Sequence, residues 1–287
     1  MEVWSVLSKE KVKELKIFAI NIRMETVRAM GTLGFGHLGG ALSIADTLAV
    51  LYGGIMKIDP KNPKWEERDW LVSSKGHAGP AIYAALALKG YFPVEELLTL
   101  NTPGTHFPSH CDRNLTIGID MTTGSLGQGA STSVGVALGH RYNGMDNFTY
   151  LILGDGETQE GQVWEAVSLA GAKKVDNLIA FVDNNKQQLD GFTKDIHDTL
   201  DFKAKFESFG WDAVDVDGSD VKQIYEAIEA AKLRRGKPSV IVLDTIKGKG
   251  ASFVEGKEKN HHVTISSEEM SQSLAELQIE MDRVVKA

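Results

Sequence analysis

The sequence has only one cysteine, Cys111, among its 287 residues. A single cysteine excludes an intramolecular disulfide, so we expect a reducing location, the cytoplasm. Positive charge is also scarce: 31 Lys and Arg stand against 39 Asp and Glu, a formal net charge of -8 at pH 7. This balance argues against a general nucleic-acid binder, although it does not exclude a small phosphorylated ligand in a local cleft.

Long apolar runs and targeting signals are missing as well. We find no apolar run of membrane-spanning length and expect no membrane association. The segment 1–16 lacks the shape of a signal peptide. With 42% apolar residues and 24% charged residues, the composition is ordinary for a globular chain, with room for one large α/β domain or two small ones.

What the chain does contain is a strand–turn–helix–strand unit over residues 148–188. The apolar run 148–153 predicts a buried strand that ends at Gly154-Asp155-Gly156. A helical pattern follows, and a second buried strand at 178–182 ends at Asp183-Asn184-Asn185. Such a unit belongs to a parallel sheet, whose ligands bind beyond the carboxyl ends of the strands.

Both strand ends carry short oxygen-bearing side chains, Asp155 and Asn185. A carboxylate and an amide are hard oxygen ligands that suit Mg²⁺, which binds through one or two protein groups plus substrate phosphates. The glycines beside Asp155 let the backbone approach a diphosphate, and the next helix offers its N-terminal amides to the same anion. The alternative is that Asp155 only caps a helix and that Asn184-Asn185 is a plain turn.

The remaining periodicity predicts alternating helices and strands. We expect helices at 8–33, 41–51, 78–89, 124–142, 200–209, 221–234 and 266–286, and strands at 69–73, 211–216 and 238–245. This alternation predicts a doubly wound, mostly parallel α/β sheet with helices on both faces, in one domain spanning 1–287. The first helix and the tail helix extend that domain. The apolar residues of the tail helix (Leu274, Leu277, Ile279 and Val284) indicate either a partner contact or a plain solvated helix.

Histidines recur in the turns that end these elements. His37 lies in a glycine-dense loop after the first helix, and His77 lies in a glycine turn after the strand at 69–73. The irregular segment 101–123 holds His106 and His110, and so long a loop inside a compact domain is usually functional. A lone histidine is more often a structural hydrogen-bonding group, but two in such turns indicate a site.

Taken in order, the motifs of this chain resemble transketolase. They are GHLGGALS (36–43), DWLVSSKGHA (69–78), TPG…SHCD (102–112), GSLGQG (124–129), GDGETQEG (154–161), VDNNKQQLDG (182–191), IKGKG (246–250) and a late histidine pair. The spacing from GDG to Asn184-Asn185 is similar to the thiamine-diphosphate signature. The resemblance covers nearly the whole chain but only the family's first, diphosphate-binding (PP) domain, so the chain resembles the N-terminal subunit of a split transketolase.

This resemblance implies a set of site residues. Asp155 and Asn185 would bind Mg²⁺ by side chain and Gln187 by its carbonyl, with Ca²⁺ or Mn²⁺ as substitutes. Residues implied to bind thiamine diphosphate are His77, Gly124, Ser125, Leu126, Gly154, Asp155, Gly156, Glu157, Asn185, Gln187, Lys247 and His261. Residues implied to act in catalysis are His37, His77, His110 and His261, which would face the substrate oxygens, and Glu160 and Glu165 at a subunit interface.

Three of these assignments have open alternatives. The family's late histidine precedes a glycine, whereas here His261 precedes His262, and the register favours His261. The SHCD string favours His110 over His106. The alternative for Glu160 and Glu165 is that they are ordinary acids in the first turn of a helix, where they favour its N-terminus.

The resemblance also implies an activity and a partner. The activity is the thiamine-diphosphate- and Mg²⁺-dependent transfer of a two-carbon ketol unit from a ketose phosphate to an aldose phosphate, as in the pentose phosphate pathway. The glutamate that activates the cofactor and the arginines that grip the sugar phosphate belong to the family's other domains. We therefore expect a C-terminal partner subunit (pyrimidine-binding plus C-terminal domains), a heterotetramer, and no turnover by the chain alone.

Other functions compatible with these motifs are the alpha subunit of a thiamine-dependent 2-oxoacid dehydrogenase, a deoxyxylulose-phosphate synthase, and a non-catalytic cofactor-binding subunit. The sequence does not specify the donor and acceptor sugars.

Overall fold

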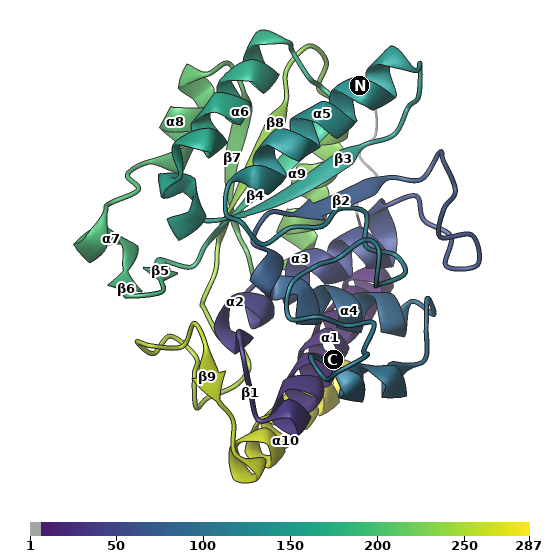
Figure 1. Ribbon diagram of the computed structural model, residues 1–287, viewed down its shortest axis with the longest axis vertical. Helices are drawn as coiled ribbons and strands as arrows, with labels where there is room; N and C mark the ends of the chain where they lie inside the picture. The colour runs from purple at the N-terminus through teal and green to yellow at the C-terminus, as the bar shows by residue number, and fades with distance from the viewer. Residues whose placement is uncertain (1–6) are drawn as a thin grey trace.

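A five-stranded parallel sheet lies at the centre of the fold (Figure 1). Its strands run in the order β2 (Trp70–Ser73), β3 (Thr149–Gly154), β4 (Leu178–Asn184), β8 (Ser239–Asp244) and β7 (Asp212–Asp217), and every neighbouring pair is parallel. The computed structural model describes residues 7–287. The predicted domain (1–287) and the segment expected not to be a signal peptide (1–16) therefore both begin outside the described residues.

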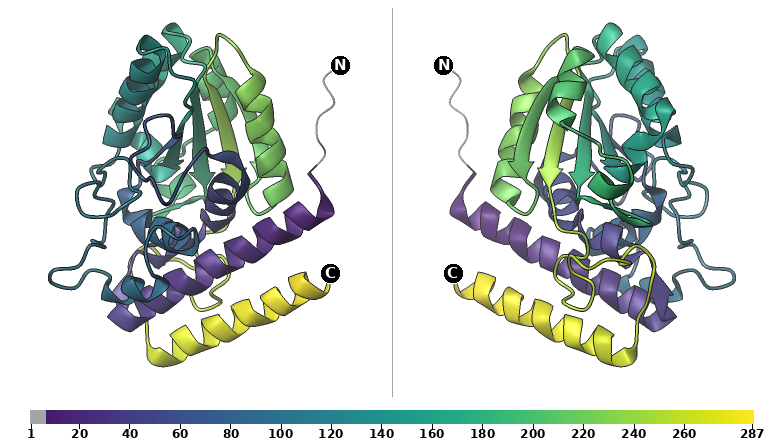
Figure 2. Two further views of the ribbon diagram at one scale, coloured as in Figure 1. Left: turned by 90° about the vertical axis from the view of Figure 1, so that its right-hand side faces the viewer. Right: turned by 90° about the vertical axis from the view of Figure 1, so that its left-hand side faces the viewer.

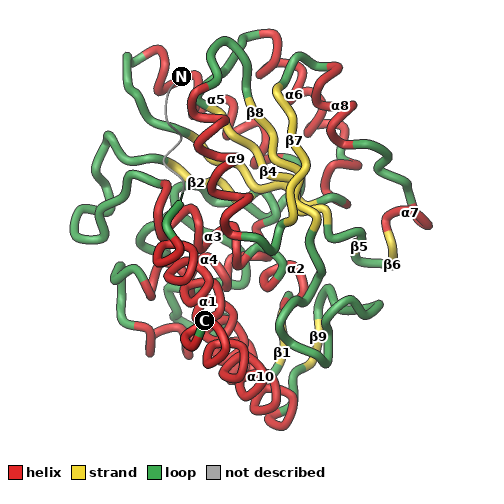
Figure 3. Tube along the Cα trace, turned by 180° about the vertical axis from the view of Figure 1, so that it is seen from behind, coloured by secondary structure: helices red, strands yellow, loops and turns green. Residues whose placement is uncertain are grey.

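The helices cover both faces of this sheet, which confirms the predicted fold class. The α-helices of the described residues are α1 (Lys9–Leu33), α2 (Leu38–Leu42), α3 (Ala45–Val50), α4 (Gly79–Leu88), α5 (Gln128–Tyr142), α6 (Gly161–Ala172), α7 (Thr193–Ile196), α8 (Phe202–Ser208), α9 (Val221–Leu233) and α10 (Ser267–Lys286). Helices α5, α6 and α8 pack on one face, and α3, α4 and α9 lie on the other, as the view from behind shows (Figure 3). The inner strands β3, β4 and β8 are largely apolar because both of their faces are buried, whereas the edge strand β7 is partly exposed and carries aspartates.

Two short antiparallel ladders lie outside the central sheet. They are β1 (Phe35–Gly36) with β9 (Val263–Thr264), and β5 (Gln187–Gln188) with β6 (Gly191–Phe192). The first ladder brings the chain near residue 262 back beside the end of α1, although more than two hundred residues separate them.

The register of the central strands decides where the site residues lie. Gly154 pairs with Asp183, and Asn184 pairs with Asp244, so β3, β4 and β8 end at the same edge of the sheet. The loops that follow β3 and β4 therefore leave the sheet side by side.

The helix predicted at 41–51 is wrong in outline. The chain forms α2, breaks at Ser43-Ile44, forms α3 and ends in a π-helical turn at Leu51–Ile55. The break coincides with a long-range contact, because the Ser43 hydroxyl donates to Asp183 Oδ2 at 2.6 Å. A buried carboxylate 140 residues away, which the local pattern cannot register, thus holds the helix end.

The expectation that no apolar run reaches membrane-spanning length is also wrong. Within residues 7–287, the segment Leu38–Ile55 has 18 residues of mean hydropathy 1.4, long and apolar enough for such a span. In the fold, 89% of this segment is buried, and its residues join the core against α1 and α4. Burial on all sides accounts for its apolar character.

The C-terminal helix α10 lies along α1 (Figure 2). The expectation of a plain solvated helix is wrong, because Leu277 is only 1% exposed and Leu274 and Val284 pack on the same core. Ile279 is 52% exposed, and a partner contact of this helix stays a prediction. Close approach is possible at Gly31 of α1, where a Cβ atom would lie 2.5 Å from the sulfur of Met270. The tail helix is therefore an internal packing element of this chain.

Truncating Leu277 should measure this packing. We expect Leu277→Ala to lower the free energy of unfolding by about 2–4 kcal/mol, because it leaves a cavity between α1 and α10. Ile279→Ala, on the exposed side of the same helix, should change it by less than about 0.5 kcal/mol. Urea titrations followed by circular dichroism check both values, and equal effects of the two substitutions would contradict the packing.

Candidate functional site

The predicted metal ligands meet at the carboxyl edge of the sheet. Asp155 follows β3 and is 2% exposed, and its two oxygens accept from the amides of Gly156 (2.7 Å) and Lys186 (2.5 Å). The second of these contacts ties it to the loop that carries Asn185 and Gln187. The structure thus brings the three predicted ligands together.

An unusual backbone conformation shapes that loop. Lys186 has φ 65, in the left-handed region that residues other than glycine seldom adopt. The turn around it lets Asn185 Oδ1 accept from the amide of Gln187 at 3.1 Å. Nearby, Lys247 is 2% exposed and its ammonium donates to the carbonyl of Gln187 at 3.3 Å. A buried cation therefore lies beside the carbonyl that the resemblance assigns to Mg²⁺.

The pKa values of two buried charged groups at this edge are shifted toward their neutral forms. Burial, followed by the charge of Asp183, raises the pKa of Asp155 to about 7. Burial also lowers the pKa of Lys247 to about 8, against the opposing attraction of Asp155. A divalent cation beside Asp155 would favour the ionised form of that carboxylate and so offset its raised pKa.

The donor set fits Mg²⁺ and a diphosphate. Among residues 7–287 no group of three or more His, Cys, Asp or Glu could hold a metal, so a metal here would use one carboxylate, one amide and one carbonyl. Mg²⁺ accepts such a sparse set because it keeps water and phosphate oxygens as its other ligands. In addition, the side-chain oxygen of Gln187 is buried without a partner in the described part of the chain.

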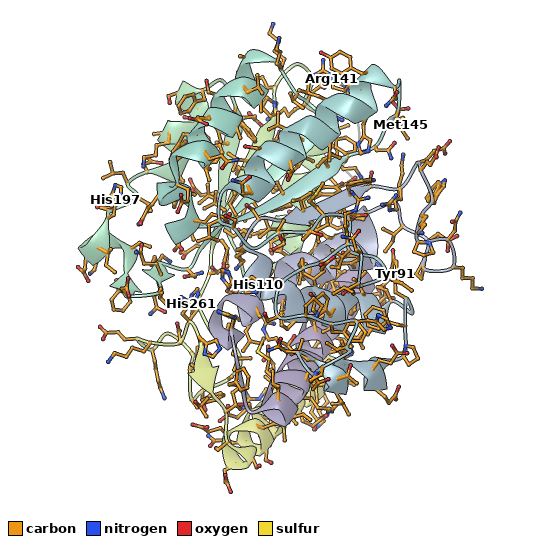
Figure 4. All side chains as sticks on the ribbon, in the orientation of Figure 1. Tyr91, His110, Arg141, Met145, His197 and His261 are labelled. Carbon is orange, nitrogen blue, oxygen red and sulfur yellow. The ribbon has the colours of Figure 1, made fainter. Side chains whose placement is uncertain are left out.

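A cluster of histidine rings lies next to this edge. Its members, with neighbouring ring centroids 4.8 to 6.4 Å apart, are His37, His77, His110, His261 and His262. Figure 4 shows His110 and His261 close together in the middle of the molecule, whereas His197 lies out by α7. His106 is exposed and does not join the cluster, in agreement with the preference for His110.

Both late histidines belong to the cluster, with different neighbours. His261 lies 4.8 Å from the ring of His77, and its Nδ1 is 3.3 Å from the ammonium of Lys247. His262 lies 4.8 Å from the ring of His37 and 5.7 Å from Phe35. The β1–β9 ladder holds this segment in place.

Tight packing behind the histidine segment fixes its position further. The Asn260 amide donates to the carbonyl of Val254 at 3.0 Å. At Gly39 a Cβ atom would lie 2.3 Å from the carbonyl of Asn260, so only glycine permits this approach.

Burial disfavours the protonated form of four of these imidazoles. It lowers the pKa of His37 to about 4, helped by His262, His110 and Lys247, and lowers the pKa of His261 to about 3, helped first by Lys247. The pKa of His77 lies well below its usual value and that of His110 is lowered, both mainly by burial. Neutral imidazoles can each donate and accept, which suits recognition of sugar hydroxyl and carbonyl oxygens.

The other predicted residues have distinct places. Glu157 is 3% exposed, and its carboxylate accepts from Ser74 Oγ and from the amides of Gly127 (2.8 Å) and Gly154 (3.0 Å). These bonds favour a role in holding the two glycine loops over direct cofactor contact. Gly124 lies against the ring of His110, where a Cβ atom would approach to 3.3 Å.

The residues next to that loop are on the surface. Ser125 and Leu126 are exposed beside Gly127, and Glu160 and Glu165 are exposed at the start of α6. Within residues 7–287 neither glutamate forms an ion pair or a side-chain hydrogen bond. Their assignment to a subunit interface stays a prediction.

Sequence reasoning missed one pair of residues in this site. Lys75 and Asp183 form a fully buried ion pair, with 2.5 Å between Lys75 Nζ and Asp183 Oδ2. Both lie within the recognised motifs SSKGHA and VDNN, and each follows or ends an apolar strand. The sequence signal for this pair is a basic residue and an acidic residue, each at the end of an apolar strand, with both strand ends at the same edge of the sheet.

A protonation measurement tests the histidine cluster. Because the folded-state pKa values of His37 and His261 are lowered, the unfolded chain binds more protons below pH 6.5, and stability should fall as the pH drops from 6.5 towards 4. We expect the ring proton resonances of both histidines to stay constant between pH 8 and 5.5. Between pH 6.5 and 4 the melting temperature of the double variant His37→Asn/His261→Asn should fall less than that of the wild type. Titration of either wild-type ring near pH 6.5 would contradict the lowered pKa values.

A parallel α/β sheet with an oxygen-lined strand edge and adjoining glycine loops fits a diphosphate-binding domain, and the family match identifies the class as thiamine-diphosphate-binding. Residues 15–284 match the family model described as transketolase, thiamine diphosphate binding domain. The chain belongs to the transketolase family, as the motifs predicted.

The relatives of this chain fall into two lengths. It is 55% identical to the 6-deoxy-6-sulfo-D-fructose transketolase subunit SqwG of a Clostridium species, covering 90% of this chain and 94% of the relative. It is 37% identical to an apulose-4-phosphate transketolase subunit of Actinobacillus succinogenes, covering 93% and 96%. Against transketolase 1 of Escherichia coli the identity is 35%, covering 89% of this chain but 40% of the relative.

Solved structures give the same answer for the fold. The transketolase of Pichia stipitis in complex with sedoheptulose 7-phosphate is 32% identical and superimposes with a TM-score of 0.85, covering 96% of this chain and 44% of that one. The chain therefore has the extent of the subunit-type relatives and corresponds to the diphosphate-binding part of the longer enzymes.

Proposed function

We propose that this chain is the diphosphate-binding subunit of a two-subunit transketolase that uses thiamine diphosphate and Mg²⁺ to move a two-carbon ketol unit between sugars. The observation that carries the proposal is the position of Lys247. Its ammonium lies 3.3 Å from the Gln187 carbonyl and 3.3 Å from His261 Nδ1, so it joins the oxygen edge to the histidine cluster. A cofactor's charged tail and a sugar's oxygens would thus be held side by side.

Each group of residues has a separate task in this proposal. Asp155, Asn185 and Gln187 would hold Mg²⁺, and Lys247 would offset the charge of the diphosphate. Thiamine diphosphate, when bound, supplies the electron sink for breaking a carbon–carbon bond next to a carbonyl.

The histidines would bind the sugar substrate. The four rings with lowered pKa values are neutral at pH 7, so they can donate to the donor's carbonyl oxygen and accept from its hydroxyl groups, and they can hold a proton for a short time as an oxygen changes charge. Because burial makes their protonated forms costly, a proton taken up by the cluster would be released readily.

The proposal includes a partner. Two relatives that the chain covers almost completely are named as subunits, and the chain covers only 40% of the E. coli enzyme, which together support a second chain with the missing domains. We propose that this C-terminal subunit supplies the cofactor-activating glutamate and the residues that bind the charged end of the sugar. Two copies of each chain would form a cytoplasmic heterotetramer. The exposed Glu160 and Glu165 would meet it.

Reconstitution tests the activity. Co-purified with the product of an adjacent gene that carries the pyrimidine-binding pattern, the chain should transfer ketol units only when Mg²⁺ and thiamine diphosphate are present. Asp155→Asn should lower kcat/KM at least about 100-fold because it weakens the metal site. Asp190→Asn, an exposed aspartate on a nearby turn, serves as the control and should be unchanged. Turnover by the rigorously purified single chain would refute the need for a partner.

A donor panel tests the substrate. We propose 6-deoxy-6-sulfo-D-fructose as the donor, because the relative named for it is 55% identical. The histidines address oxygens common to all ketoses, so discrimination must come from the far end, where a sulfonate carries one charge and a phosphate nearly two. The kcat/KM for 6-deoxy-6-sulfo-D-fructose should exceed the kcat/KM for fructose 6-phosphate and for apulose 4-phosphate at least about tenfold. Preference for a phosphate donor would contradict this choice, and carbon dioxide release from a 2-oxoacid would indicate the dehydrogenase alternative.

A further inference from the structure

The most heavily hydrogen-bonded carboxylate at the sheet edge is that of Asp183, which is 0% exposed. Its Oδ2 accepts from Lys75 Nζ at 2.5 Å, from Ser43 Oγ at 2.6 Å and from Asn185 Nδ2 at 2.9 Å, and its Oδ1 accepts from Thr245 Oγ1 at 2.5 Å. These donors come from the ends of β2, α2 and β8 and from the loop after β4. Several element ends near the site are thus tied to one side chain.

The contact with Asn185 has a consequence for metal binding. An ionised carboxylate only accepts hydrogen bonds, so it can engage only the NH₂ end of an amide. With Nδ2 held by Asp183, the amide must present Oδ1 on the opposite side, where it already accepts from the amide of Gln187. Asp183 therefore decides which end of Asn185 faces the loop of the predicted metal ligands.

Lys75 is the charged partner of Asp183, with 2.5 Å between Lys75 Nζ and Asp183 Oδ2, and both side chains are buried. Lys75 Nζ also donates to the carbonyl of Gly40 at 2.7 Å, and a Cβ atom at Gly40 would lie 3.3 Å from His77 Nε2. The ion pair thus contacts the segment that packs behind the histidine cluster.

We propose that Asp183 and Lys75 are a positioning pair that fixes the Asn185 amide with its oxygen toward a divalent cation. The inference rests on the proposed function to the extent that this edge holds Mg²⁺. The competing explanation, that the pair only stabilises the fold, is weak on physical grounds, because desolvation of two charges offsets most of their attraction.

Metal binding by the two-subunit complex tests the proposal directly, apart from activity. Mg²⁺ is titrated calorimetrically with thiamine diphosphate in excess, and Mn²⁺ binding is followed by electron paramagnetic resonance. We expect Asp183→Asn to weaken both about 10- to 100-fold, as for groups that orient metal ligands. Thr245→Val removes a donor to the same carboxylate without touching Asn185 and should stay within about threefold.

A reciprocal exchange separates positioning from stabilisation. Asp183→Asn/Asn185→Asp again joins an amide to a carboxylate, now with carboxylate oxygens toward the metal, and should recover metal affinity to within about tenfold of wild type. It does not restore the ion pair with Lys75, so a purely stabilising role predicts no recovery. If Asp183→Asn does not fold, the apolar pair Lys75→Met/Asp183→Leu takes its place and should fold but bind Mg²⁺ at least about tenfold more weakly.

The outcomes that overturn the inference are distinct from failure of the proposed function. Wild-type Mg²⁺ affinity in Asp183→Asn or in the apolar pair, or an exchange variant that recovers nothing, overturns the positioning role alone. A wild-type complex that binds neither Mg²⁺ nor thiamine diphosphate overturns the proposed function and the inference with it.

Discussion

The parallel register of β3 with β4 is the constraint on which the rest of the site depends. Gly154 opposite Asp183 makes the two strands end together, so Asp155 after one strand and the loop after the other lie side by side and largely buried. A one-residue shift would turn every side chain of a strand to the opposite face of the sheet, and both faces of these strands are packed by helices. The apolar core thus fixes the polar edge, although its own side chains offer no group that could bind a metal or a phosphate.

This edge concentrates charge where water is scarce. Two carboxylates, Asp155 and Asp183, and two ammonium groups, Lys75 and Lys247, are each at most 2% exposed. Lys75 and Asp183 pair with each other and have further hydrogen-bond partners, whereas Asp155 has only backbone donors and Lys247 has carbonyls and His261. The raised pKa of Asp155 and the lowered pKa of Lys247 reflect that difference. The satisfied pair acts as scaffold, and the two less satisfied groups lie where a metal and its diphosphate would compensate them.

Much of the fold and half of the site follow from local sequence. The buried strands are continuous apolar runs bounded by glycine, aspartate and asparagine, so their ends, and with them Asp155 and Asn185, could be located from the order of residues alone. What could not be located depends on distant contacts. The break at Ser43 is set by Asp183, and the place of α10 is set by α1. His262 joins the cluster through β1–β9, a ladder of two residues per strand, which is too short to leave a periodic signal.

The same distinction bears on the proposal that a partner completes the site. Its buried groups are ordered by contacts within the chain, so the cation edge and the neutral histidines are preorganised without a partner. By contrast, Leu126, Glu160 and Glu165 lie exposed on the side of the glycine loops, where no described residue of the chain completes their surroundings. Electrostatic preorganisation of binding groups can be encoded in one chain, because it needs only a rigid scaffold. In the proposed complex, activation requires a group that approaches from this open side and therefore needs a second surface. The exposed side of the glycine loops is accordingly where we expect the partner subunit to bind.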